Sequence, residues 1–234
     1  MKIAGLQKMT LLDYPGKVAC TIFIQGCNFR CPFCHNSDLL GAGEAAFMTE
    51  DELIAFLEKR TGLLDAVCIT GGEPTLSAGL SELIAQIKSL GYLVKLDTNG
   101  TRPQTVKALV EANLIDYVAM DIKNSPACYA ETVGVTSVDM APIEESIRFL
   151  SSGAVDYEFR TTVVDELHSE ESMQEMGQWL ASLVSGNRVK RLYLQRFVDR
   201  ESVLFSGLNP PDDGKMAKFM ECLEPFAEYI AVRG

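Results

Sequence analysis

Three cysteines lie close together near the start of the chain, in a segment that could bind an inorganic centre. Cys27, Cys31 and Cys34 follow the spacing C-x3-C-x2-C. Thiolates are soft ligands that suit zinc and iron-sulfur clusters, and three of them in so short a segment can reach one centre. The sequence therefore predicts a metal site in this loop.

Three kinds of site are compatible with this spacing. Structural zinc usually takes four ligands in two pairs, and the sequence offers no second pair at matching spacing. A 4Fe-4S cluster with four protein ligands would need His35 or one of the separate cysteines, which are Cys20, Cys68, Cys128 and Cys222. A cluster held by three cysteines leaves one iron open to a small molecule. A disulfide or a chance grouping is the third interpretation, and spacing favours the iron-sulfur cluster.

Composition limits the class of protein. The formal net charge of −11 argues against nucleic acid as a direct partner, since contacts to phosphate need a surplus of Lys and Arg. No uncharged apolar run is long enough to span a membrane, and the first residues lack the apolar core of a signal peptide. We therefore expect a cytoplasmic protein with no membrane association, folded as a single domain over residues 1–234.

Strand-like and helix-like segments alternate along the chain. The apolar, β-branched segment 17–25 leads directly into the cysteine loop, and Thr49 with Glu52 forms a capping box that predicts a helix start. The expected strands cover residues 17–25, 65–70, 92–96, 117–120, 157–164 and 189–195. The expected helices cover residues 48–59, 80–90, 103–112, 142–150, 169–183 and 213–223.

This alternation predicts an α/β fold with a parallel sheet, although it does not separate a barrel from a doubly wound sheet. The carboxyl ends of parallel strands share one rim, where ligands bind. The residues at the expected strand ends are the cysteine triplet, Gly71, Gly72, Glu73, Asp97, Thr98, Asp121, Lys123, Arg160 and Gln195.

Each of these strand ends also has a purely structural interpretation. Gly71-Gly72-Glu73-Pro74 and Asp97-Thr98-Asn99-Gly100 both suit tight turns. Asp121 and Lys123 could form a solvated charge pair. Arg160 interrupts an apolar strand, so its guanidinium needs an anionic partner. His168 stands among acidic residues, and we expect it on the surface.

The cysteine motif reads C-N-F-R-C-P-F-C, with Phe33 before the last cysteine, and it resembles the signature of the radical S-adenosylmethionine superfamily. The flanking segments T-L-L-D-Y-P-G-K and C-H-N resemble those of glycyl radical enzyme activating enzymes, most closely the type that activates anaerobic ribonucleoside-triphosphate reductase. The resemblance implies a partial TIM-type (β/α)6 barrel. It also implies a 4Fe-4S cluster on Cys27, Cys31 and Cys34, whose fourth iron binds S-adenosylmethionine.

The resemblance assigns roles to further residues. It places the backbone of Gly71, Gly72 and Glu73 at the methionyl ammonium, Asp121 and Lys123 near the ribose and carboxylate, and Phe33 and His35 beside the adenine. We expect Arg160, as a buried guanidinium, to lie in the cofactor site as well. The resemblance implies a histidine in pyruvate formate-lyase activators at the position of Phe197, and Gln195 would take over some of its hydrogen bonding. Asp97, Thr98, Asp121 and the Ala119 carbonyl would hold a monovalent cation.

The function implied is reductive cleavage of S-adenosylmethionine to a 5′-deoxyadenosyl radical, which installs a glycyl radical on a partner enzyme. The expected partner is anaerobic ribonucleoside-triphosphate reductase, with flavodoxin or ferredoxin as the electron donor. Three alternatives stay open: an activator of pyruvate formate-lyase or another glycyl radical enzyme, a radical S-adenosylmethionine enzyme acting on a small molecule, and a non-catalytic iron-sulfur redox sensor.

Overall fold

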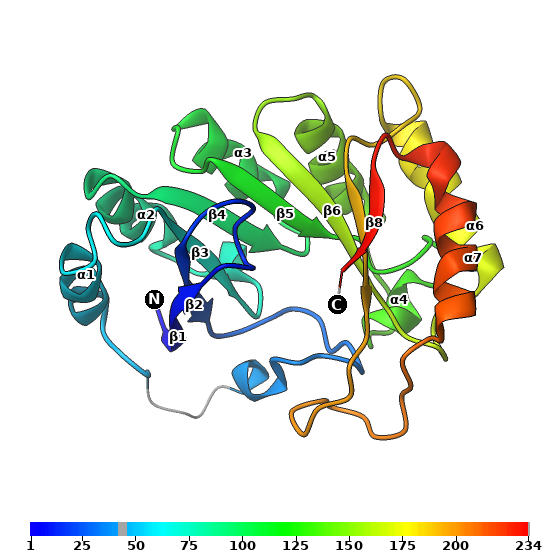
Figure 1. Cartoon of the computed structure of the whole chain (residues 1–234), viewed down its shortest axis with the longest axis horizontal. Coiled ribbons are helices and arrows are strands. Elements are labelled where there is room, and N and C mark those ends of the chain that lie inside the picture. Colours follow the sequence, from blue (N-terminus) through cyan, green and yellow to red (C-terminus); the bar gives the residue numbers. More distant parts are fainter. Residues whose placement is uncertain (42–45, 234) are drawn as a thin grey trace. The chain divides into compact units, whose positions relative to one another are not determined.

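The computed structural model describes residues 1–41 and 46–233 of the chain. In these residues strands alternate with helices, and the strands of the sheet follow chain order from β1 to β8 (Figure 1). The chain clusters into two compact units, each assembled from separate segments. The first unit comprises residues 1–28, 38–98 and 104–119, and the second comprises residues 29–37, 99–103 and 120–234. A single domain over residues 1–234 stays a prediction.

The first unit is built on parallel strands with one antiparallel neighbour. β1 (Ile3–Thr10) pairs antiparallel with β2 (Ala19–Ile24), whereas β2, β3 (Ala66–Gly71) and β4 (Leu93–Thr98) are parallel. β5 (Tyr117–Asp121) begins in this unit. Its helical segments are α1 (Glu50–Glu58), η2 (Pro74–Leu76) and α2 (Leu80–Ser89), together with all but the first residue of η1 (Ser37–Leu40) and of α3 (Pro103–Glu111).

Burial explains why these segments form these elements. Ile22, Ile24, Val67 and Ile69 are fully buried, as expected of strands covered on both faces. The predicted capping box at the start of α1 is confirmed, because the Thr49 side chain accepts from the Glu52 amide while the Glu52 carboxylate accepts from the Thr49 amide.

The second unit contains three further parallel strands. These are β6 (Asp156–Val163), β7 (Leu192–Arg196) and β8 (Ile230–Arg233). Its helical segments are α4 (Tyr129–Thr132), α5 (Met140–Ser151), α6 (Glu170–Leu183), α7 (Asp213–Leu223) and η3 (Glu224–Phe226). Helices α6 and α7 pack side by side (Figure 1). None of the described helices is both long and apolar enough to cross a membrane.

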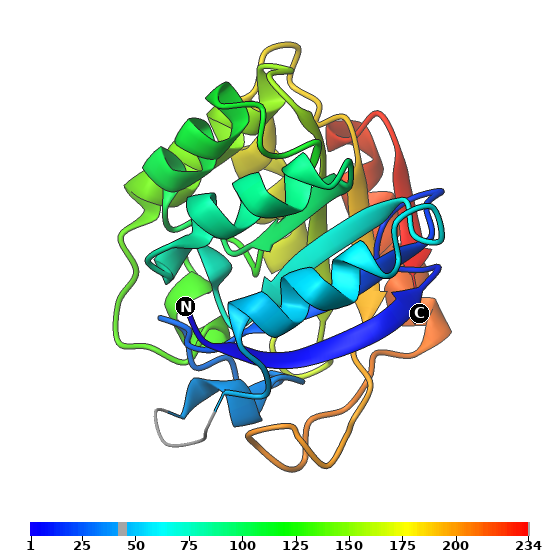
Figure 2. The same cartoon turned by 90° about the vertical axis from the view of Figure 1, so that its left-hand side faces the viewer.

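The six predicted strand-helix units correspond to β2 through β7, so the predicted alternation is confirmed. The prediction missed β1, β8 and the short α4. β1 is an edge strand with much of its length exposed to solvent, and it lacks the apolar run that marks the inner strands (Figure 2). β8 has only four residues, and none of them is buried. A segment this short shows no recognisable hydrophobic periodicity.

Candidate active site

The cysteine loop begins where β2 ends. Cys31 is 8% exposed, whereas Cys27 and Cys34 are half-buried, and all three are free thiols. Cys27 belongs to the first unit, and Cys31 and Cys34 belong to the second. No three His, Cys, Asp or Glu side chains of the described residues are grouped so that they could hold a metal ion by themselves. The ligand role of the triplet stays a prediction.

In the first unit, the end of β3 is packed against the start of the cysteine loop. The Gly72 amide donates to the Ile24 carbonyl at 2.9 Å, and the Glu73 amide donates to the Gly26 carbonyl at 2.7 Å. A Cβ atom at Gly71 would lie 2.3 Å from the Ile24 oxygen, and one at Gly72 would lie 2.0 Å from the Gly26 oxygen. Glycine is thus required at both positions because backbone atoms of the neighbouring segment leave no room for a side chain. The expected contact of this strand end with a methionyl ammonium stays a prediction.

The Gly72→Ala variant tests this close approach. The added methyl group has no room beside the Gly26 carbonyl, so the loop before Cys27 must shift. We expect the free energy of unfolding to fall by about 2–3 kcal/mol, as for other overpacked sites. Urea denaturation measures this. Gly5→Ala is the control, because its Cβ would meet Phe23 at an ordinary 3.5 Å. Equal stability of the two variants would contradict the steric argument.

The Glu73 side chain is fully buried and is held by the protein itself. Its Oε1 accepts from the Thr75 amide at 3.0 Å and from the Thr98 hydroxyl at 2.9 Å. These bonds tie the end of β3 to the end of β4. The Glu73 side chain therefore holds the ends of β3 and β4 together. The resemblance assigns cofactor binding only to the backbone of Glu73.

The predicted monovalent cation site stays a prediction. The electrostatic argument for it, that two carboxylates without a cation would repel each other, is not supported by the ion pairs in the structure. Asp97 is ion-paired with the buried Lys95, and Asp121 is ion-paired with Lys123 and Arg160. Each carboxylate thus has a protein cation beside it, so repulsion between the two gives no reason to expect a metal ion. The Ala119 carbonyl and Thr98 remain the other predicted ligands.

In the second unit, Asp121 accepts from two cations. Lys123 Nζ and Arg160 Nε each lie 3.0 Å from a different oxygen of Asp121, and the side chains of Lys123 and Arg160 are 12% and 13% exposed. Burial opposes ionisation of Asp121, but the charges of Arg160 and Lys123 outweigh it and lower its pKa to about 2. The predicted anionic partner of Arg160 is therefore Asp121. Arg160 itself lies in the middle of β6, not at its end.

Lys123 links this charged group to the cysteine loop. Its ammonium lies 5.8 Å from the centre of the Phe33 ring. Burial alone would lower the pKa of Lys123, but the Asp121 charge, followed by Cys31, raises it. Lys123 therefore stays cationic beside Cys31 and Phe33.

His35 and Phe197 stack on each other. Their ring centroids are 5.7 Å apart with an interplanar angle of 10°, and His35 Nε2 lies 2.7 Å from the Val198 carbonyl oxygen. Phe197 is fully buried, whereas Gln195 on β7 is half-buried. Phe197 is thus an aromatic support for His35. Adenine binding by Phe33, His35 and Gln195 stays a prediction.

Sequence reasoning missed the segment after β7 that holds the end of the cysteine loop. The Ser202 hydroxyl donates to the His35 carbonyl at 2.8 Å, and the Phe205 amide donates to the Pro32 carbonyl at 3.2 Å. These contacts join residues more than 160 positions apart in the chain. No local pattern in residues 197–205 signals them.

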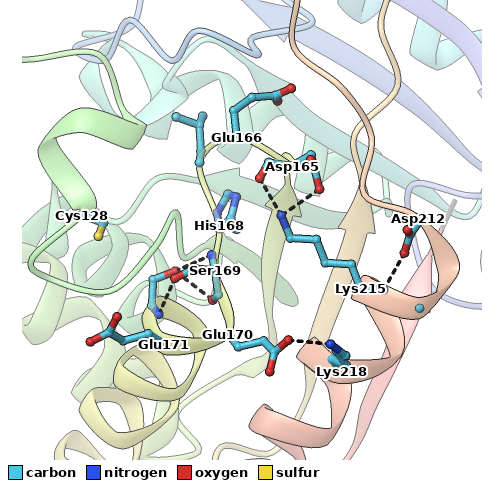
Figure 3. A pocket seen from close by; sticks show the side chains of 13 residues that line it. Cys128, Asp165, Glu166, His168, Ser169, Glu170, Glu171, Asp212, Lys215 and Lys218 are labelled. Carbon is cyan, nitrogen blue, oxygen red and sulfur yellow. Dashed lines mark hydrogen bonds and ion pairs between the residues drawn. The ribbon is translucent and has the colours of Figure 1, made fainter.

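The prediction that His168 lies on the surface is wrong. It is 2% exposed and forms the wall of a pocket of about 850 Å³ at the N-terminal ends of α6 and α7 (Figure 3). Its Nε2 lies 2.9 Å from the Lys123 carbonyl oxygen, and its Nδ1 lies 3.1 Å from the Val164 amide. With Nε2 protonated, both contacts are satisfied hydrogen bonds. The acidic neighbours misled the prediction because they face solvent while His168 faces inward.

His168 makes stability depend on pH. Burial lowers its pKa below the ordinary 6.5, so the unfolded chain binds a proton that the folded chain does not. The free energy of unfolding should therefore decline as pH falls below about 6.5, by up to about 1.4 kcal/mol per pH unit. His168→Gln, whose amide can still donate to Lys123, should flatten this part of the curve. Urea denaturation at several pH values measures both, and equal slopes would contradict the assignment.

Comparisons with known proteins identify the family. The Radical SAM superfamily model matches residues 21–166. A candidate glycyl-radical enzyme activating enzyme of Methanocaldococcus jannaschii is 35% identical over 184 residues, covering 75% of this chain and 74% of that protein. A pyruvate formate-lyase-activating enzyme of Listeria monocytogenes is 30% identical, covering 64% of this chain and 63% of the relative. A 7-carboxy-7-deazaguanine synthase of Thermococcus kodakarensis is 28% identical and covers 70% of each chain.

The fold agrees with this relationship. The crystal structure of Streptococcus suis SuiB bound to S-adenosylmethionine superposes with a TM-score of 0.67 at 14% identity, covering 92% of this chain and 52% of that one. The expected fold class, an α/β partial barrel with a mostly parallel sheet, is confirmed. The family's cofactors, a 4Fe-4S cluster and S-adenosylmethionine, are those that the cysteine motif predicted. The chain belongs to the radical S-adenosylmethionine superfamily and, within it, to the glycyl radical enzyme activating enzymes.

Proposed function

We propose that this activating enzyme installs the glycyl radical of an anaerobic ribonucleoside-triphosphate reductase. The observation that carries the choice of partner is Phe197, which is buried against His35. The sequence resemblance implies a histidine at this position in pyruvate formate-lyase activators. The flanking segments T-L-L-D-Y-P-G-K and C-H-N support the same choice. Activation of pyruvate formate-lyase is the nearest alternative, because a relative bears that name.

The charged residues of the second unit fit the family's cofactors. Two cations, Lys123 and Arg160, both donate to one carboxylate, that of Asp121. Cations with little solvent access favour nearby anions, such as a thiolate or a carboxylate. These residues therefore suit a thiolate-bound cluster and an amino-acid carboxylate better than a neutral ligand.

In this proposal Cys27, Cys31 and Cys34 would hold the 4Fe-4S cluster, to which S-adenosylmethionine would bind. The bound cofactors supply one-electron cleavage of the S–C5′ bond, with flavodoxin or ferredoxin as the source of the electron. The chain itself binds and orients. Lys123 and Arg160 offer positive charge, the strand end at Gly71, Gly72 and Glu73 offers backbone groups, and Phe33 packs beside Lys123.

Two measurements test the proposal in sequence. Protein reconstituted anaerobically with iron and sulfide should release 5′-deoxyadenosine when given dithionite and S-adenosylmethionine. It should then generate a glycyl radical signal, detected by electron paramagnetic resonance, on purified anaerobic ribonucleoside-triphosphate reductase. Purified pyruvate formate-lyase is the matched control partner. A signal on pyruvate formate-lyase alone would reverse the choice of partner, and no 5′-deoxyadenosine under any condition would refute the cofactor chemistry.

A small-molecule substrate is the second candidate, because a relative at 28% identity is named a 7-carboxy-7-deazaguanine synthase. Transfer of deuterium from a deuterated glycyl peptide into 5′-deoxyadenosine separates the two. Label in the product supports a protein substrate. Unlabelled product formed at an undiminished rate favours a small molecule. The remaining alternative, a non-catalytic redox sensor, is set aside because the chain belongs to an enzyme family.

A further inference from the structure

A lysine lies in the interior of the first unit, on one of its parallel strands. Lys95 is 1% exposed and occupies the middle of β4. Fully buried lysines are rare, because moving an ammonium out of water is unfavourable unless an anion pairs with it. An apolar side chain would fill the same place without this desolvation, so the charge itself points to a role.

The surroundings of Lys95 follow from the alternation of side chains along β4. Leu93, Lys95 and Asp97 are two residues apart, so they share one face of the strand. At the start of β4, Leu93 packs against a buried apolar cluster, and Cys68 of that cluster is the register partner of Lys95 on β3. At the end of β4, the Lys95 ammonium donates to the Asp97 carboxylate. Lys95 therefore places a positive charge between the apolar interior of the unit and the carboxylate at the strand end.

This ion pair involves a residue that was predicted to bind a monovalent metal ion. The Asp97 side chain is 16% exposed, and the ammonium beside it balances its single negative charge. A metal ion on the same carboxylate would lie close to that ammonium, and like charges with little solvent around them repel strongly. The other predicted carboxylate, Asp121, is paired within the second unit with Lys123 and Arg160. The carboxylates of the predicted cation site therefore fit a metal ion poorly.

We infer that the Lys95 ammonium takes the place of the monovalent cation that the resemblance implies at Asp97, so that the chain carries its own counter-charge. Lys95 is then a positioning residue, because it acts on the cofactor site through Asp97. A bound metal ion is lost when its concentration falls, whereas an ammonium on the chain is present in any salt. The role of Asp97 near the cofactor rests on the proposed function, but the replacement of a metal ion by Lys95 can also be tested without cofactors.

Binding of S-adenosylmethionine in two salts tests the inference. Calorimetry on cluster-replete protein compares potassium chloride with tetramethylammonium chloride at equal ionic strength, because the methyl groups of tetramethylammonium prevent coordination by oxygen. Wild type should bind with equal affinity in both salts. Lys95→Met keeps most of the stem and removes the charge, so potassium should strengthen its binding about tenfold over tetramethylammonium. Lys88→Met is the control, because Lys88 also pairs with an aspartate, Asp116, but lies on the helix α2, and this variant should respond to salt as wild type does.

Thermal unfolding of cluster-free protein gives a readout that needs no cofactor. In tetramethylammonium, Lys95→Met should unfold about 10 °C below wild type, because Asp97 loses its buried partner. Potassium should raise the thermal midpoint of Lys95→Met more than that of wild type. Should Lys95→Met fail to fold, Lys95→Gln takes its place in both comparisons.

The response to potassium decides the outcome. A wild-type response equal to or larger than that of the Lys95 variant would overturn the inference, because an ion would then bind in spite of the lysine. A larger response of the variant supports it. If wild type binds no S-adenosylmethionine in either salt, the proposed function fails, and the unfolding measurements alone then decide the role of Lys95.

Discussion

The Cys31→Ala variant is expected to lose cluster assembly and S-adenosylmethionine cleavage while the chain stays folded. A cluster held by three protein thiolates has no spare ligand, and loss of groups that only support metal ligands already costs about 10–100-fold. Loss of a ligand itself should therefore reduce cleavage by more than about 100-fold. Cys31 is 8% exposed, so removing its sulfur leaves a small, nearly buried gap that should cost only about 1 kcal/mol of stability.

Iron and sulfide content, the visible absorption of the cluster and 5′-deoxyadenosine release measure the outcome. The control is Cys222→Ala, because Cys222 is a half-buried free thiol on α7, outside the cysteine loop. It should retain cluster and activity. Full cluster content in Cys31→Ala would show that another residue ligates the iron, and then the assignment of the triplet fails.

The Asp121→Asn variant is expected to destabilise the second unit and to weaken cofactor binding. The change keeps the shape of the side chain but leaves Lys123 and Arg160, each nearly buried, without the carboxylate between them. Breaking a buried ion pair from one side costs about 3–5 kcal/mol. Because 27% of the Asp121 side chain is exposed, we expect about 3 kcal/mol, the lower end of that range.

The same carboxylate predicts a pH dependence. The folded pKa of Asp121, about 2, lies below the ordinary 3.8, so its contribution to stability is complete above pH 3.8 and is lost as pH falls toward 2. The difference in the free energy of unfolding between wild type and Asp121→Asn should therefore narrow below pH 3.8. Urea denaturation at about pH 7 and at about pH 2–3 measures it, and calorimetry with S-adenosylmethionine measures binding to cluster-replete protein.

Asp156→Asn is the matched control for charge removal. Asp156 also pairs with two cations, Lys190 and Arg191, but its side chain is 58% exposed. Exposed pairs contribute about 0–1 kcal/mol, so this variant should be nearly neutral. If Asp121→Asn proves as mild as Asp156→Asn, the three-residue charge group is not a structural element of the site.

Local patterns determined the elements of this fold. The strands that become β2 to β7 are short apolar segments followed by helical periodicity, and the start of α1 is set by Thr49 and Glu52 within one turn. The cysteine motif was equally readable because its three thiols lie in one loop. The sequence also predicted that Arg160, an arginine within an apolar strand, pairs with an anion, and the structure shows its ion pair with Asp121.

Only the tertiary structure decided which residues meet. Arg160 lies 39 positions from Asp121, and His168 lies 45 positions from Lys123, so no window of sequence contains either pair. Burial of His168 depends on how its segment crosses the second unit, and its acidic neighbours suggested the opposite. The need for glycine at positions 72 and 134 comes from carbonyl groups of other segments, Gly26 and Arg30. The sequence thus determined which chemically active residues this chain carries. The long-range contacts decided which side chains hold those residues in place, because the distance in space between two residues depends on the topology of the fold and not on their separation along the chain.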